Sequence, residues 1–260
     1  MCFCLDAEPP TPPISGGAVR GEELILTSSL DGAKFNAYAG HVVTGATPAR
    51  SGIVILPDVR GLYSFYKDLA LRFAEAGVHA IAIDYFGRTA GVAERDDSFD
   101  YMPQVMQTKQ PQIRDDVAAA IAQMRSGANP PRTIFTVGFC FGGGNSYQQA
   151  ANHLGLAGVI GYYGSPTREG RDGSPSPISR LGDFECPVLG FFGGADQGIP
   201  PEQAHEFDVA LAQAGIEHEI IVYPGAPHSF FDRKYQEFAK ESEDSWGHAL
   251  AFIGAHTPQP

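Results

Sequence analysis

The chain has 260 residues, 43% of them hydrophobic and 18% charged, and these proportions are typical of a folded globular protein. A net charge of -12 argues against nucleic acid and against anionic membrane surfaces as partners. The length suffices for one large domain, which we place at residues 21–260 after a flexible Pro/Gly-rich arm at residues 1–20.

The first half of the chain alternates strands and helices at short spacing. An Asp-Gly pair in the turn Ser29–Gly32 favours an antiparallel hairpin at the edge of the sheet. The apolar run Gly52–Leu56 has no polar alternation and predicts a central parallel strand. The elements predicted here are strands over 23–27, 33–39, 52–56 and 78–84 and a helix over 65–76.

The second half continues the alternation after a charged, irregular segment at residues 89–109. That segment follows a strand end, so a small lid over the site and a solvated surface loop both remain open. The fold class is therefore α/β, with a mostly parallel central sheet flanked by helices. The later predicted elements are helices over 111–125, 145–153, 202–214 and 235–253, strands over 134–137, 156–163, 187–192 and 217–223, and a Gly/Pro/Ser loop over 164–182.

One turn between a strand and a helix carries a reactive side chain. Gly138-Phe139-Cys140-Phe141-Gly142 repeats the G-x-S-x-G nucleophile-elbow pattern with Cys in place of Ser. A helix that begins just after Cys140 directs free N–H groups and its positive end at the sulfur, which favours the thiolate. The alternative is a buried cysteine in a Gly-rich turn.

Asp196 and His228 also follow predicted strands directly. Because parallel strands end at the same edge of a sheet, both side chains can meet Cys140 there. The chain order of nucleophile, Asp and His is the order of α/β-hydrolase triads. If each residue is considered alone, the alternatives are that Asp196 forms a turn and that His228 is an ordinary loop histidine. We assign the oxyanion hole to the N–H groups of Phe141 and Val59.

The other cysteines indicate the cellular compartment. Cys2 and Cys4 are spaced like metal ligands, but no second Cys or His pair completes such a site. Unpaired thiols suit a reducing cytoplasm, and the N-terminus lacks the basic and apolar regions of a secretory signal. No apolar stretch approaches membrane-spanning length, so we expect a cytoplasmic protein that binds no metal.

The chain resembles the dienelactone hydrolase family over about residues 20–254, in five short stretches that include the surroundings of Cys140, Asp196 and His228. The resemblance implies an α/β-hydrolase fold, the triad Cys140, Asp196 and His228, and no metal or organic cofactor. The stretches that carry it are Gly138–Gly143, Gly194–Asp196, Pro227–Phe230, Leu56–Gly61 and Asp84–Arg88.

The resemblance also implies residues around the substrate. Asp58 stands where the family often has a Glu that is associated with the resting nucleophile, and it is one methylene shorter. Arg88 matches an arginine that helps to bind the substrate carboxylate. Arg233 lies one residue beyond the position of a second such arginine. For each arginine, a surface ion pair with one of the many acidic residues is the alternative.

The predicted activity is hydrolysis of lactones or activated esters through an acyl-thioester, of the carboxymethylenebutenolidase type. A thiolate leaves a tetrahedral intermediate more readily than an alkoxide, so sulfur favours substrates with stabilised leaving groups. We expect the binding partner to be a small lactone or ester, including substrates that bear a carboxylate. We expect the protein to be a monomer or a homodimer. The alternatives are a general carboxylesterase, a cysteine peptidase, and a non-catalytic thiol redox or binding protein.

Overall fold

The computed structural model describes residues 19–43, 50–96, 98–127 and 129–258. The expected arm at 1–20 therefore lies almost wholly outside the described residues, as do Cys2 and Cys4. No helix in the described ranges combines the length and the hydropathy needed to cross a membrane.

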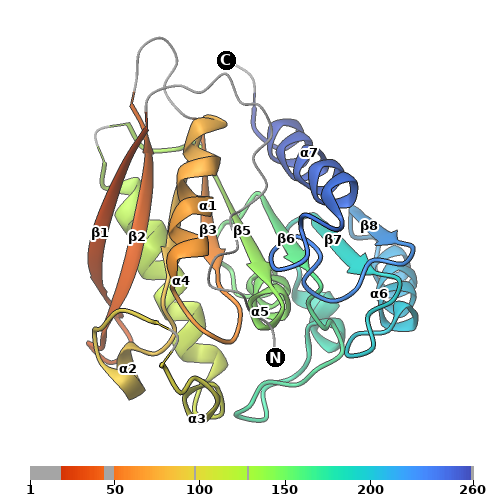
Figure 1. Cartoon of the computed structure of the whole chain (residues 1–260), viewed down its shortest axis with the longest axis horizontal. Coiled ribbons are helices and arrows are strands. Elements are labelled where there is room, and N and C mark those ends of the chain that lie inside the picture. Colours follow the sequence, from red (N-terminus) through yellow and green to blue (C-terminus); the bar gives the residue numbers. More distant parts are fainter. Residues whose placement is uncertain (1–18, 44–49, 97, 128, 259–260) are drawn as a thin grey trace.

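A single eight-stranded sheet runs through the molecule (Figure 1), with the strand order β1-β2-β4-β3-β5-β6-β7-β8. The hairpin β1–β2 is antiparallel, and β2 also pairs antiparallel with β4, whereas all other pairs are parallel. This confirms the predicted α/β fold with an N-terminal hairpin. The strands are β1 (Val19–Thr27), β2 (Lys34–Val42), β3 (Ser51–Leu56), β4 (Val78–Ile83), β5 (Thr133–Phe139), β6 (Gly158–Tyr162), β7 (Val188–Gly193) and β8 (His218–Tyr223).

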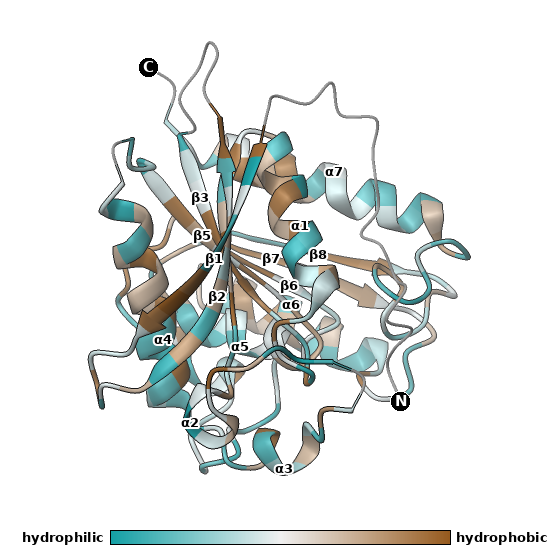
Figure 2. Cartoon of the chain, turned by 60° about the vertical axis from the view of Figure 1, so that its left-hand side comes forward, coloured by the Kyte–Doolittle hydropathy of each residue, from teal (hydrophilic) through white to brown (hydrophobic). Residues whose placement is uncertain are grey.

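Helices cover both faces of the sheet. Alternate side chains of each central strand point to opposite faces, so Ile53 packs with α1 and α7 while Val54 packs toward α4. Figure 2 shows hydrophobic strands between helices that carry hydrophilic residues. The helices are α1 (Ser64–Glu75), α2 (Gly87–Ala90), α3 (Met102–Val105), α4 (Gln110–Arg125), α5 (Phe141–Gln149), α6 (Pro201–Gln213) and α7 (Ala239–Ala255), with a 3-10 turn η1 (Pro177–Asp183).

Three segments differ from the sequence expectation. Helix α5 spans Phe141–Gln149 instead of 145–153; it begins directly after Cys140, as the elbow pattern predicts, because the glycines that follow fit into a close approach to β3. The last helix begins at Ala239, since residues 228–238 form turns that hold His228 in place. The segment 89–109 contains the end of α2 and all of α3, and Arg95 fastens it to Asp84 with a buried 2.8 Å ion pair.

Candidate active site

Cys140 occupies a strained turn at the end of β5. Its φ of 55° lies in the left-handed region that ordinary side chains avoid, as a nucleophile elbow requires. The two glycines of the motif permit this turn. A Cβ on Gly138 would lie 1.9 Å from the carbonyl oxygen of Gly142, and one on Gly142 would lie 2.0 Å from that of Leu56. No other residue type therefore fits either position.

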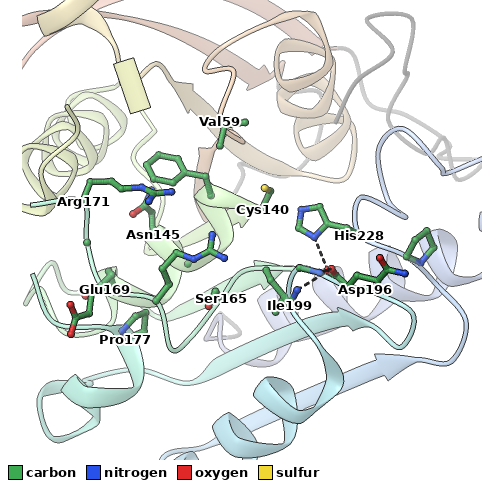
Figure 3. Close-up of a pocket in the computed structure, with 18 of the residues that line it drawn as sticks. Val59, Cys140, Asn145, Ser165, Glu169, Arg171, Pro177, Asp196, Ile199 and His228 are labelled. Carbon is green, nitrogen blue, oxygen red and sulfur yellow. Dashed lines mark hydrogen bonds and ion pairs between the residues drawn. The ribbon is translucent and has the colours of Figure 1, made fainter. Parts of the chain in front are cut away.

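Helix α5 starts at the residue after Cys140, so its N-terminal dipole faces the sulfur. The Phe141 N–H is at the first helical position and has no acceptor within the helix. In Figure 3 the Cys140 sulfur points toward the His228 ring, and Val59 lies on the opposite side of the sulfur from Asp196. This arrangement favours a thiolate beside a base.

Asp196 and His228 form a short hydrogen bond. The distance from His228 Nδ1 to Asp196 Oδ2 is 2.6 Å, and Oδ1 of the same carboxylate accepts the N–H groups of Gly198 at 2.8 Å and Ile199 at 3.0 Å. Burial alone would raise the pKa of Asp196, but these donors outweigh it and lower the pKa. The carboxylate is therefore ionised at neutral pH and orients the imidazole.

His228 lies on a turn after β8 that places its ring between acid and sulfur. The next residue, Ser229, has a φ of 62° and turns the chain sharply. Asp196 holds Nδ1, so the other ring nitrogen faces the Cys140 side (Figure 3) and can accept a proton there. The ring of Tyr163 packs against the imidazole at a centroid distance of 5.0 Å.

A cavity of about 540 Å³ opens over these residues. None of the described residues of 89–109 lines it, which favours a surface loop over a lid, the two alternatives that the sequence left open for that segment. Of the residues predicted from sequence, those that line the cavity are Val59, Cys140, Phe141, Asp196, His228 and Arg233.

Sequence reasoning missed the wall formed by the segment 164–182. Ser165, Arg168 and Arg171 from this segment line the cavity, and Arg171 is directed into it in Figure 3. Arg180 fastens the far end of the segment to α5 by donating to Gln148 at 2.8 Å and to the Ala151 carbonyl at 2.8 Å. The sequence feature that could have predicted this wall is the position of the segment after the C-terminal end of a parallel strand, where α/β proteins place their binding loops.

Arg88 does not line the cavity. Its guanidinium forms bidentate hydrogen bonds with Asp116, at 2.6 and 2.9 Å, and with Asp31, at 2.7 and 3.1 Å. The Asp116 side chain is 1% exposed, and burial raises its pKa to about 6 although Arg88 opposes the rise. The geometry corresponds to the alternative of an ion pair with the chain's own acidic residues, although this pair is largely buried rather than at the surface.

Replacing Arg88 by Gln is therefore expected to destabilise the fold without changing substrate preference. It leaves the buried Asp116 without its cation, which costs about 3 kcal/mol of unfolding free energy. The KM for a carboxylated lactone should stay within about twofold. Arg20→Gln, which removes an exposed pair with Glu22, is the control and should cost under about 1 kcal/mol. A tenfold rise in KM for the carboxylated substrate alone would contradict this prediction and would show that Arg88 binds the substrate carboxylate.

Asp58 also lies outside the cavity lining, contrary to the expectation of a residue in the substrate site. Its side chain is fully buried, and its Oδ2 accepts hydrogen bonds from Tyr66 at 2.9 Å and Tyr63 at 3.2 Å. The loop that carries it continues into Val59, so Asp58 anchors the segment that supplies the proposed oxyanion N–H.

Cys186 differs chemically from Cys140. Burial raises the pKa of the Cys186 thiol to about 12, so this sulfur stays protonated at neutral pH. Of the two cysteines within the described residues, only Cys140 therefore has the surroundings of a nucleophile.

Comparisons with known proteins show which family this chain resembles. The model of the dienelactone hydrolase family matches residues 38–257. A protein of Escherichia coli K12 named "Putative carboxymethylenebutenolidase" is 30% identical over 77% of this chain and 75% of its own length. Its namesake from Methylorubrum extorquens is 29% identical over 77% of this chain and 72% of its own length.

Solved structures show the same fold. The structure described as a putative dienelactone hydrolase from Klebsiella pneumoniae has a TM-score of 0.78 at 24% identity, covering 92% of this chain and 99% of its own. A dienelactone hydrolase-like promiscuous phosphotriesterase from metagenomic libraries has a TM-score of 0.77 at 18% identity, covering 93% and 100%. By the match of the family model over most of its length, the chain belongs to the dienelactone hydrolase family.

Proposed function

We propose that the protein hydrolyses lactones or activated esters with Cys140 as its nucleophile. The observation that carries the proposal is the 2.6 Å pair of His228 and Asp196 beside a cysteine on a nucleophile elbow, all three lining one cavity. The name carboxymethylenebutenolidase, which the relatives carry, supports a lactone as the substrate class.

The reaction proceeds in two steps. The Cys140 thiolate attacks the carbonyl carbon. The carbonyl oxygen becomes an oxyanion, which accepts hydrogen bonds from the backbone N–H groups of Val59 and Phe141. The bond from carbon to the leaving oxygen then breaks, that oxygen takes the proton of the His228 imidazolium, and an acyl-thioester remains. His228 next takes a proton from water, the hydroxide adds to the thioester, and the thiolate leaves with release of the acid.

A sulfur nucleophile restricts the range of esters that the enzyme can hydrolyse. A thiolate is expelled from the tetrahedral intermediate more readily than an alkoxide, so ordinary alkyl esters return to starting material. Enol lactones and aryl esters have stabilised leaving groups and go forward. A general carboxylesterase on the same fold is the second candidate, and comparable turnover of alkyl esters would favour it.

Arginines at the cavity suit a substrate that carries a carboxylate. Arg168 and Arg171 come from the segment after β6, and Arg233 follows the catalytic histidine. The carboxylate of Glu169, between the first two, is turned away from Cys140 in Figure 3. Guanidinium groups bind carboxylates in a bidentate geometry. We assign to these three residues the carboxylate-binding role that the family resemblance implied for Arg88 and Arg233.

The double variant Arg168→Gln/Arg171→Gln tests the substrate class. We expect KM for a carboxylated lactone to rise about tenfold or more, with KM for neutral p-nitrophenyl acetate unchanged, because only the former loses an ion pair. Arg132→Gln removes an exposed arginine at the opposite end of β5 and serves as the control. Equal effects on both substrates would exclude carboxylate binding by this pair.

Assays with the carboxylated lactone and p-nitrophenyl acetate also distinguish a hydrolase from a thiol redox or binding protein. Such a protein would turn over none of the esters or lactones and would oxidise Cys140 reversibly. A nucleophilic thiolate needs a reducing environment, and this supports the cytoplasm as the compartment.

A further inference from the structure

Tyr85 connects the two segments to which we assign the oxyanion hole. The residue lies just after β4, is 5% exposed and does not line the cavity. Its hydroxyl donates to the Pro57 carbonyl at 2.8 Å, in the loop that carries Val59. Its ring meets the ring of Phe141 edge to face, with the centroids 5.3 Å apart and the planes at 79°. Tyr85 therefore holds both segments from outside the cavity.

The hydrogen bond from Tyr85 fixes one end of the peptide that precedes the oxyanion donor. The N–H of that peptide belongs to Asp58 and donates to the Tyr66 hydroxyl at 3.0 Å. The carbonyl of the next peptide, that of Asp58, accepts the Gly61 N–H at 3.2 Å. Because a trans peptide is planar, its N–H points opposite to its carbonyl, so these contacts set the direction of the Val59 N–H.

The carbonyl that Tyr85 holds lies where the loop meets α5. A Cβ added to Gly142 would lie 2.3 Å from the Pro57 oxygen, so the loop and the first turn of the helix are in close contact there. Val59 and Phe141 both pack, partly buried, against the hydrophobic cluster that contains Tyr85. A shift of the Pro57 carbonyl would therefore change the spacing between the two oxyanion donors.

Tyr85 is itself held in one position. The preceding residue, Asp84, forms the buried ion pair with Arg95 at 2.8 Å, and its N–H donates to the Asn36 carbonyl at 2.9 Å. Burial raises the pKa of Tyr85 well above its ordinary value, so the hydroxyl keeps its proton and stays a donor. The hydrogen bond to the loop is thus formed before any substrate binds.

We propose that Tyr85 is a positioning residue of the oxyanion hole, which sets the spacing of the Val59 and Phe141 N–H groups through the Pro57 carbonyl. The role rests on the proposed function, because these N–H groups serve the reaction only when an oxyanion forms. Tyr85 then affects the attack of Cys140 on a carbonyl and leaves other reactions of the same sulfur unchanged.

Two reactions of Cys140 together test this role. The kcat/KM for p-nitrophenyl acetate reports attack on a carbonyl, in which an oxyanion forms. Iodoacetamide alkylates the same sulfur, which displaces iodide at a saturated carbon, so no oxyanion forms. Both rates depend on the same thiolate, and their ratio isolates the oxyanion hole. In Tyr85→Phe, which keeps the ring and removes the hydroxyl, we expect kcat/KM to fall about tenfold and the alkylation rate to stay within about twofold.

A second variant addresses the other end of the same peptide. Tyr66→Phe removes the hydroxyl that accepts the Asp58 N–H, and it should lower kcat/KM with the alkylation rate again within about twofold. Circular dichroism checks the fold, and this variant decides the question if Tyr85→Phe does not fold. Tyr162→Phe is the matched control, because this buried hydroxyl also donates to a backbone carbonyl, that of Ser245 at 3.2 Å. It should leave the ratio of the two rates unchanged.

The outcomes distinguish this role from the proposed function. If Tyr85→Phe hydrolyses p-nitrophenyl acetate as fast as the wild type, or if both reactions slow equally, Tyr85 does not position the oxyanion hole. The same conclusion follows if Tyr162→Phe changes the ratio as much as Tyr85→Phe does. If the wild type is alkylated at Cys140 but hydrolyses none of the esters or lactones, the proposed function is wrong, and the role of Tyr85 is refuted with it.

Discussion

Replacement of Cys140 by Ala is expected to lower kcat/KM for p-nitrophenyl acetate by at least about 10³-fold, with the fold intact. The sulfur is the only group that the proposed mechanism uses to attack the carbonyl, and no water-based route replaces it in the same geometry. The side chain is small and lies at a cavity wall, so its loss should leave the unfolding free energy within about 1 kcal/mol of the wild type. Steady-state kinetics and urea denaturation measure the two quantities.

The control for this variant is Cys186→Ala, which removes a buried thiol with a raised pKa and should leave kcat unchanged. A thiol-alkylating reagent should inactivate the wild type in step with modification of Cys140, as located by peptide mass mapping. If activity survives complete alkylation of Cys140, the cysteine is not the nucleophile and the reaction does not pass through an acyl-thioester.

Replacement of Gly142 by Ala should damage both the fold and the reaction. The added Cβ would lie 2.0 Å from the Leu56 carbonyl oxygen and 2.3 Å from that of Pro57, and both are backbone atoms that cannot rotate away. We expect a loss of about 3 kcal/mol of unfolding free energy. The displaced loop also carries Val59, so kcat should fall about 10²-fold in the protein that does fold.

Gly247→Ala is the matched control for this substitution. Gly247 lies within α7, and no atom lies within 4 Å of a Cβ added there. Its replacement should raise the unfolding free energy by about 0.5–1 kcal/mol, because alanine loses less backbone entropy in a helix. If Gly142→Ala were as stable and as active as the wild type, the close packing of the elbow against β3 would be refuted.

The sequence was most informative where local pattern and topology act together. Apolar runs without alternation predicted the central strands, and the glycines around Cys140 predicted the tight turn that β5 makes into α5. Asp196 and His228 were found because parallel strands bring their carboxyl ends to one edge. The structure places these three side chains at one cavity, and their catalytic roles stay a proposal.

The interactions that sequence reasoning missed are formed by side chains far apart in the chain. The partners of Arg88 are Asp31 and Asp116, 57 and 28 residues away, and no local pattern distinguishes such a structural arginine from a substrate-binding one. Composition identified the segment 164–182 as a loop but did not show that it lines the cavity.

The attachment of that segment by Arg180 has a consequence for engineering and for divergence within the family. The stretch between Ser165 and Arg180 is fixed at its far end to α5, and it supplies one wall of the cavity without contributing a triad residue. Exchanging only this stretch between relatives should therefore transfer substrate preference as a module, while the chemistry at the sulfur is inherited unchanged from the recipient scaffold.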